Sequence, residues 1–90
     1  DLIFLNEQGQ VTEGARSTIF VEQEGRLVTP PVRCGLLPGV LRNHLLSDPD
    51  GKISVQPLLP DDLRLSHCIY MGNAVHNLIR VELRDETVDI

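Results

Sequence analysis

The sequence predicts an α+β domain built on a mixed β-sheet. Three observations carry this prediction: about six short runs are rich in β-branched and aliphatic residues, one or two segments have helical character, and the two kinds of segment do not alternate strictly. Glycine and proline residues separate the runs. A chain of 90 residues is expected to form a single small domain, or a piece of one.

Composition and charge narrow the possible functions. Aromatic residues make up 3% of the chain, so aliphatic side chains must fill the core. The formal net charge is −5 and no basic run occurs, which argues against a nucleic-acid partner because phosphates are bound by clustered Lys and Arg. No apolar stretch is long enough to span a membrane, and no signal-peptide pattern occurs. Cys34 and Cys68 do not form a disulfide framework, so a cytoplasmic protein is expected.

The first third of the chain is predicted to be extended. Its central strand is the most strongly indicated, because it is dense in β-branched and aromatic residues. Gly9 provides the positive φ for an early turn, and the Glu24-Gly25 pair is typical of a tight hairpin turn. Strands are expected, in chain order, at residues 2–6, 11–12, 18–23 and 26–29.

Two helical segments follow. Pro30-Pro31 ends the preceding strand, and residues 32–37 are expected to be a loop. Residues 40–47 follow Pro38-Gly39 and carry a crude helical stripe of apolar side chains, which makes them the best helix candidate. Residues 60–63 have the composition of a helix start, since acidic side chains favour the positive end of a helix dipole.

The remaining strands complete the predicted sheet. A strand over residues 52–58 belongs at an edge of the sheet, because Pro57 cannot donate a ladder hydrogen bond. A further strand spans residues 67–71 and is broken at Gly72-Asn73-Ala74. The last strand is expected at residues 78–83, and the polar tail, residues 84–90, is expected to fray.

Two glycine-containing pieces, residues 11–20 and 35–42, carry the candidate chemistry. The first offers the Glu13 carboxylate, and the second offers backbone N–H groups at a helix start after Gly39. A pocket built from both would suit a cofactor with a cationic ring nitrogen and an anionic phosphate. Ordinary alternatives exist, in which Glu13 is a solvated turn residue and the second piece is a helix start without a ligand.

Three motifs in order, NEQGQVTEGARSTIFV, GRLVTPP and GLLPGVLR, resemble the C-terminal domain of fold-type IV enzymes that depend on pyridoxal 5′-phosphate. The resemblance covers residues 1 to about 81. It implies the D-amino-acid aminotransferase-like fold, with a mixed, barrel-like sheet. GARSTIF together with CGLLPGVLR is most similar to 4-amino-4-deoxychorismate lyase, including the lyase-like module fused behind para-aminobenzoate synthase component I.

The resemblance also implies roles for individual residues. Glu13 matches the carboxylate that pairs with the pyridine nitrogen of the cofactor and keeps it protonated. The backbone N–H groups of Val40 and Leu41 match those that hold the phosphate. Ser17 and Thr18 match small polar residues that lie near the cofactor.

On the substrate side, Asn73 matches a polar residue that faces the substrate in lyases. Arg16 and Arg42 are carboxylate-binding candidates, but arginines in such positions are more often solvated or ion-paired at the surface. Leu41 departs from the family pattern, which often has a Thr that adds a phosphate contact. Thr18 stands where the family often has Asn.

The lysine that forms the Schiff base with the cofactor lies upstream of these residues in the family. The only lysine here is Lys52, in a solvated turn, where it is a poor catalytic candidate. The chain is therefore expected to be a C-terminal fragment, residues 1–90, that is inactive alone and lacks the N-terminal domain and the catalytic residues. A metal site is not expected, because the cysteines and His44, His67 and His76 lack ligand spacing.

The resemblance implies an enzyme that converts 4-amino-4-deoxychorismate to 4-aminobenzoate and pyruvate in folate biosynthesis. One alternative is a class IV aminotransferase of branched-chain or D-amino acids. Another is a non-catalytic interaction module. The expected partners are a small-molecule substrate, the missing N-terminal domain and a second subunit, because family members are commonly homodimers.

Overall fold

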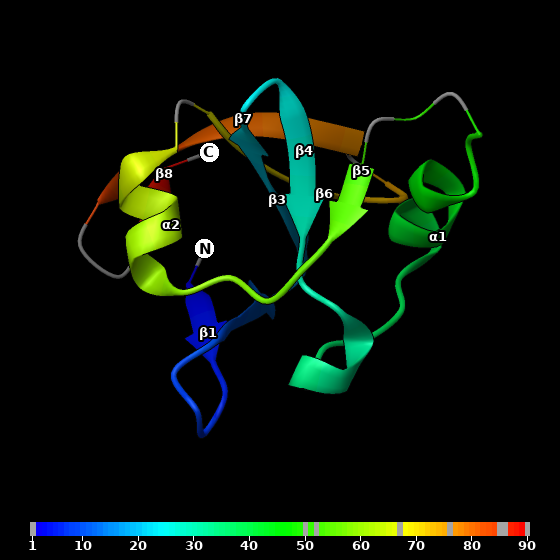
Figure 1. Ribbon diagram of the computed structural model, residues 1–90. Coiled ribbons are helices and arrows are strands. Elements are labelled where there is room, and N and C mark those ends of the chain that lie inside the picture. The colour runs from blue at the N-terminus through cyan, green and yellow to red at the C-terminus, as the bar shows by residue number, and fades with distance from the viewer. Residues whose placement is uncertain are drawn as a thin grey trace.

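The computed structural model describes residues 2–49, 51, 53–66, 68–75, 77–84 and 87–89. Its strands form a two-stranded sheet, β1–β2, and a six-stranded sheet in the order β5–β4–β3–β6–β7–β8 (Figure 1). The strands are β1 Ile3–Leu5, β2 Val11–Gly14, β3 Thr18–Gln23, β4 Arg26–Thr29, β5 Ile53–Val55, β6 Ile69–Asn73, β7 Asn77–Arg84 and β8 Thr87–Asp89. The helices are the 3-10 helix η1 Val32–Cys34, and α1 Val40–Leu46 and α2 Pro60–Leu65.

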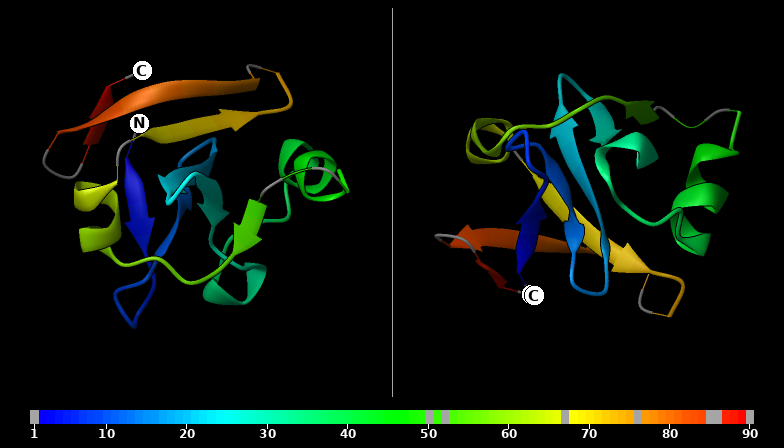
Figure 2. Two further views of the ribbon diagram at one scale, coloured as in Figure 1. Left: turned by 45° about the horizontal axis from the view of Figure 1, so that its top comes forward. Right: turned by 90° about the horizontal axis from the view of Figure 1, so that it is seen from below.

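The larger sheet is mixed, as predicted. Strand β4 pairs with β5 in parallel, and the other neighbours in the sheet pair antiparallel. Parallel neighbours need a crossover connection, and here that connection contains η1 and α1. The helices α1 and α2 lie on opposite sides of the β3–β4 hairpin (Figure 2). The strand order is linear, and no pairing among the described residues closes the sheet into a barrel.

The β3–β4 hairpin forms with the predicted boundaries. Glu24 and Gly25 have φ values of 51° and 78°, the two positive values that a type I′ turn requires. This turn matches the right-handed twist of the strands it connects. Strand β3 is central, between β4 and β6, which explains its continuous burial from Thr18 to Val21.

Aliphatic side chains make up most of the core, as the scarcity of aromatic residues predicts, although the largest fully buried side chain is Phe20. The buried cluster contains Val11, Ile19, Val21, Val28, Leu58, Leu63, Ile69, Met71 and Val81. Leu63 is the residue that α2 buries in this cluster. No helix within the described residues is long and apolar enough to cross a membrane.

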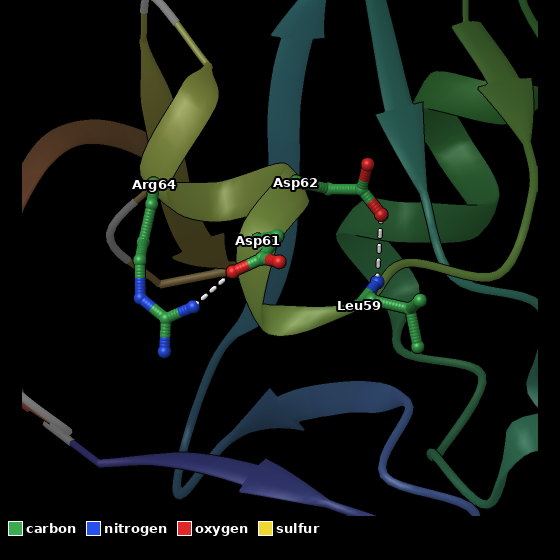
Figure 3. A network of polar contacts seen from close by, with 4 residues as sticks. All are labelled: Leu59, Asp61, Asp62 and Arg64. Carbon is green, nitrogen blue, oxygen red and sulfur yellow. Dashed lines mark hydrogen bonds and ion pairs between the residues drawn. The ribbon is translucent and has the colours of Figure 1, made fainter.

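Helix α2 begins with the acidic capping that its composition predicts. The Leu59 N–H donates to Asp62 Oδ2 at 2.7 Å (Figure 3). The Asp62 N–H donates back to the Leu59 carbonyl at 2.9 Å. Asp61 forms an exposed ion pair with Arg64 on the next turn. The two carboxylates lie at the positive end of the helix dipole, where negative charge is stabilising.

Three predicted boundaries near the end of the chain are wrong. Strand β6 continues through Gly72 and Asn73 instead of breaking there, because these residues pair with Leu78 and Asn77 of β7. The tail does not simply fray, since β8 pairs with β7. The predicted strand over residues 52–58 shortens to β5, which lies at the sheet edge as expected. His67, His76 and Lys52 lie outside the described residues.

We expect Thr29→Val to destabilise the protein. Thr29 is fully buried, and its Oγ1 donates a 2.7 Å hydrogen bond to the Ile19 carbonyl, which joins β4 to β3. The valine keeps the shape but removes the donor, so the free energy of unfolding should fall by about 1–2 kcal/mol in urea denaturation. Equal unfolding free energies for Thr29→Val and the wild type would contradict the assigned bond.

Candidate functional site

A pocket of ≈ 200 Å³ lies where the β2–β3 connection, the start of α1 and the end of β6 meet. All six residues that the sequence predicts for cofactor and substrate binding line it. The lining residues are Glu13, Gly14, Ala15, Arg16, Ser17, Thr18, Leu37, Gly39, Val40, Leu41, Asn73 and Ala74. The fold therefore brings together residues that are up to 60 positions apart in the sequence, from Glu13 to Asn73.

Glu13 is a half-buried residue of β2, so it is not a solvated turn residue. Its Oε1 accepts a hydrogen bond from the Leu37 N–H at 3.2 Å, which holds the loop before α1 against β2. The Gly14 N–H donates to the Ser17 carbonyl at 2.9 Å and closes the turn after the strand. Glu13 thus lies at the wall of the pocket, and its carboxylate is held by a backbone donor of Leu37, which lines the same pocket.

Thr18 and Gly39 meet at the base of the pocket. Thr18 begins β3 and is 7% exposed. A Cβ atom placed on Gly39 would lie 3.5 Å from Thr18 Oγ1, in ordinary van der Waals contact. The absence of a side chain at Gly39 keeps this space open, so the Thr18 hydroxyl and the start of α1 face the same small volume.

Helix α1 begins without a side-chain cap. Gly39 is its N-cap residue, with an extended backbone, and the first turn contains no acidic residue. The N–H groups of Val40 and Leu41 belong to the first turn, so they have no partner inside the helix. Backbone donors of this kind favour an anion. The Val40 side chain is 74% exposed, so its contribution to the pocket comes mainly from the backbone.

Asn73 lies at the end of β6, on the far wall of the pocket. Its Nδ2 donates to the Arg16 carbonyl at 2.9 Å, and its Oδ1 accepts from the Val75 N–H at 2.9 Å. These two bonds fasten the turn after β2 to the β6–β7 connection. The substrate contact predicted for Asn73 therefore stays a prediction, and its structural role is the one that the geometry shows.

Arg42 is not a surface residue, contrary to the sequence-based expectation. It is 5% exposed and is the only residue that α1 buries. Its Nη2 donates to the Pro30 carbonyl at 3.0 Å, whereas its buried Nε has no hydrogen-bond partner. Burial lowers the pKa of the guanidinium from its ordinary value. This bond ties α1 to the residue that follows β4.

Sequence reasoning missed Leu37 and Gly39 as pocket residues. The available signal was the LLPG run, in which a loop residue directly before Pro38-Gly39 must lie close to the helix start.

A larger hollow of ≈ 660 Å³ lies between the β3–β4 hairpin, β5 and α2. It contains none of the predicted site residues and is lined mainly by polar surface side chains such as Glu22, Arg26 and Gln56.

Metal ligands do not gather anywhere in the described part of the chain. No group of three or more His, Cys, Asp or Glu side chains that could hold an ion occurs there. Cys34 is buried, Cys68 is half-buried, and both are free thiols. The residues that line the pocket with polar side chains are Glu13, Arg16, Ser17, Thr18 and Asn73.

A concave site with apolar walls and a few converging polar groups is a common setting for the binding of a small molecule. The chain belongs to the family "Amino-transferase class IV", whose model matches residues 1–83. Enzymes of this family depend on pyridoxal phosphate.

Relatives support the assignment at the level of the family. A candidate branched-chain-amino-acid aminotransferase from Thermotoga maritima is 41% identical over 46 residues, which are 51% of this chain and 17% of that protein. A candidate amino-acid aminotransferase from Mesorhizobium loti superimposes with a TM-score of 0.84 and 36% identity, over 91% of this chain and 39% of that one. A candidate 4-amino-4-deoxychorismate lyase from Legionella pneumophila superimposes with a TM-score of 0.82 and 25% identity, over 87% of this chain and 30% of that one.

The chain spans less than two fifths of each of these relatives. The matched regions nevertheless contain the elements that build the pocket, since the family model reaches from residue 1 to residue 83. The comparisons thus establish the family and the fold of this chain.

Proposed function

We propose that this chain is the cofactor-binding part of a pyridoxal-phosphate-dependent 4-amino-4-deoxychorismate lyase. The single observation that carries the proposal is the pocket itself, which places the Glu13 carboxylate and the uncapped start of α1 on opposing segments. These two features complement the two ends of the cofactor, a ring nitrogen that can be protonated and a phosphate. The cofactor, when bound, supplies an electron sink for the breaking of a bond in the substrate.

Glu13 holds a proton on the ring nitrogen in this proposal. A carboxylate does this better than a neutral side chain because it stabilises the positive charge of the protonated ring. The Leu37 N–H, at 3.2 Å from Oε1, fixes the orientation of the carboxylate and leaves its second oxygen to face the ring. The role therefore needs no rearrangement of the strand.

The N–H groups of Val40 and Leu41 bind the phosphate. Gly39 allows the phosphate to approach because no side chain fills the space beside Thr18 Oγ1. Thr18 and Ser17 lie next to these donors in the pocket and orient the cofactor through their hydroxyl groups. Leu41 offers only its backbone, so Thr18 supplies the hydroxyl that family members often have at the position of Leu41.

The rest of the enzyme lies outside these residues in this proposal. A lysine upstream of residue 1 binds the cofactor covalently and moves the proton, and an upstream domain covers the substrate. The 90 residues alone are then inactive. We further propose a cytoplasmic homodimer that acts in folate biosynthesis, with neither a nucleic acid nor a membrane as partner.

The lyase reaction is supported by the motifs GARSTIF and CGLLPGVLR and by the likeness to the Legionella pneumophila protein. A second candidate function, an aminotransferase of branched-chain amino acids, is supported by the higher identity to the Thermotoga maritima protein. The two functions share the pocket and differ in what happens to the amino group. A lyase releases 4-aminobenzoate and pyruvate, whereas an aminotransferase passes the amino group to a keto acid.

The test uses the natural full-length protein. It is loaded with pyridoxal phosphate and reduced with borohydride, and the modified residue is mapped by mass spectrometry. The same preparation is then assayed with 4-amino-4-deoxychorismate and, separately, with branched-chain amino acids and 2-oxoglutarate. We expect a modified lysine upstream of residue 1 together with release of 4-aminobenzoate.

Other outcomes would point elsewhere. A modified lysine with keto-acid-dependent amino transfer and no 4-aminobenzoate would replace the lyase by the aminotransferase. A protein that takes up no cofactor would leave a non-catalytic interaction module and would remove the roles proposed for Glu13 and Val40.

A further inference from the structure

Arg16 is the one charged residue among the exposed residues that line the pocket. These residues, called the rim below, are Ala15, Arg16, Leu37, Val40 and Ala74, and all but Arg16 are apolar. Glu13 also lines the pocket, but it is half-buried and accepts a hydrogen bond from the Leu37 N–H. The rim is therefore apolar apart from a single cation.

The main chain around Arg16 is fixed, whereas its guanidinium has no partner in the described part of the chain. Asn73 Nδ2 donates to the Arg16 carbonyl at 2.9 Å, and the Gly14 N–H donates to the Ser17 carbonyl at 2.9 Å. These two bonds hold the turn that carries Arg16. No hydrogen bond or ion pair joins the guanidinium to a described residue. The side chain is thus exposed, and an incoming anion can reach it.

The charges of the pocket lining do not neutralise each other. Glu13 and Arg16 are three positions apart and line the same pocket, but they form no ion pair. The formal net charge of the chain is −5, so an anionic ligand meets overall repulsion that a local cation offsets. A guanidinium also matches the geometry of a carboxylate, with which it forms two parallel hydrogen bonds.

An exposed arginine is most often only solvated, and the composition of the rim is what argues against that role here. Leu37 and Val40 are 73% and 74% exposed, so the rim offers apolar surface to a ligand beside the one cation. Such a rim complements a molecule that has an apolar body and an acid group at the end that lies away from the pocket interior.

We propose that Arg16 is a specificity-determining residue that binds a second carboxylate of the substrate at the rim. This inference rests on the function proposed above, in which the cofactor and the reacting end of the substrate occupy the interior of the pocket. 4-Amino-4-deoxychorismate carries two carboxylates, whereas a branched-chain amino acid offers Arg16 only an apolar side chain. The substrate class is therefore a small acid with two carboxylates.

The test compares two unreactive ligands of five carbons, glutarate and pentanoate, which differ in one end group, a carboxylate or a methyl. Each is titrated into the full-length protein loaded with pyridoxal phosphate, and binding is measured by calorimetry. The variants are Arg16→Gln, which removes the charge, and Arg16→Lys, which keeps the charge but not the planar fork. The control is Arg33→Gln, which makes the same change of charge at an exposed residue of η1 that does not line the pocket.

We expect the wild type to prefer glutarate and Arg16→Gln to weaken glutarate binding roughly fivefold or more, with pentanoate within about twofold. Arg16→Lys should lose about twofold for glutarate, because an ammonium group cannot form the paired hydrogen bonds. Arg33→Gln should match the wild type. With 4-amino-4-deoxychorismate, Arg16→Gln should raise KM and leave kcat within about twofold. High salt should reduce the preference of the wild type, because it screens an exposed ion pair.

Several results would overturn the inference. A cofactor-loaded wild type that binds glutarate and pentanoate equally, or equal losses of both ligands in Arg16→Gln, would exclude a carboxylate site at Arg16. Weaker uptake of the cofactor by Arg16→Gln, with the glutarate preference intact, would place the guanidinium on the cofactor instead. Should Arg16→Gln not fold, a wild-type preference that is insensitive to salt would contradict the inference. A wild type that takes up no cofactor would contradict the proposed function, and this inference would fall with it.

Discussion

Glu13→Gln should lower kcat/KM of the full-length enzyme on the order of 100-fold or more, since it removes the charge that keeps the ring nitrogen protonated. The substitution is nearly isosteric. Glutamine Oε1 can accept the Leu37 N–H as the carboxylate does, so the loop before α1 stays in place. The loss should therefore appear in activity and in the absorption spectrum of the bound cofactor, while the free energy of unfolding changes by less than about 0.5 kcal/mol.

Glu7→Gln is the matched control for this experiment. Glu7 is an exposed residue of the turn between β1 and β2, outside the pocket, and its substitution makes the same change of charge. It should leave kcat/KM at the wild-type value. A Glu13→Gln enzyme with activity within about threefold of the wild type would show that the ring nitrogen has another partner.

Gly72→Ala should give the largest loss of stability of any single methyl group added to this chain. A Cβ atom at Gly72 would collide with the Asn77 carbonyl oxygen, and it would lie 2.6 Å from the carbonyl carbon of Asn77 and 2.9 Å from the Leu78 Cα. All three atoms belong to the backbone of β7, which pairs with Gly72, so no side chain can rotate away. We expect the free energy of unfolding to fall by about 3 kcal/mol or more, measured by urea denaturation.

Gly51→Ala provides the comparison. A Cβ atom there would lie 3.1 Å from the Asp48 carbonyl oxygen, at an exposed turn that can shift by the small distance required. Its cost should stay below about 1 kcal/mol. Similar losses for Gly72→Ala and Gly51→Ala would mean that β6 and β7 separate more easily than their pairing indicates.

Local chemistry accounts for the parts of the fold that the sequence predicted well. The β3–β4 hairpin depends on Glu24 and Gly25, whose positive φ values are a property of the turn itself. The start of α2 depends on Asp62, which caps the Leu59 N–H three residues away. Five of the six predicted site residues belong to two of the motifs, residues 6–21 and 35–42, and the fold brings these two motifs and Asn73 together around one pocket.

The errors arise where distant segments decide the structure. The low strand propensity of Gly72 and Asn73 predicts that the strand breaks there. The two residues nevertheless lie in β6, which has neighbouring strands on both sides, and this pairing outweighs the propensity. Strand β8 pairs with the edge of β7, a distant contact that the composition of the tail does not reveal. The burial of Arg42 depends on the Pro30 carbonyl, which the crossover brings to it and which no periodicity reveals.

The bond from Asn73 to the Arg16 carbonyl joins positions 57 residues apart, and it has a consequence for biosynthesis. A nascent chain that ends before β6 has Glu13, Thr18 and the start of α1 but lacks the far wall of the pocket. Loop closure over such a separation comes late in folding. A ligand that needs the completed pocket would bind only the finished fold, and it would thereby favour completed molecules over partly folded ones.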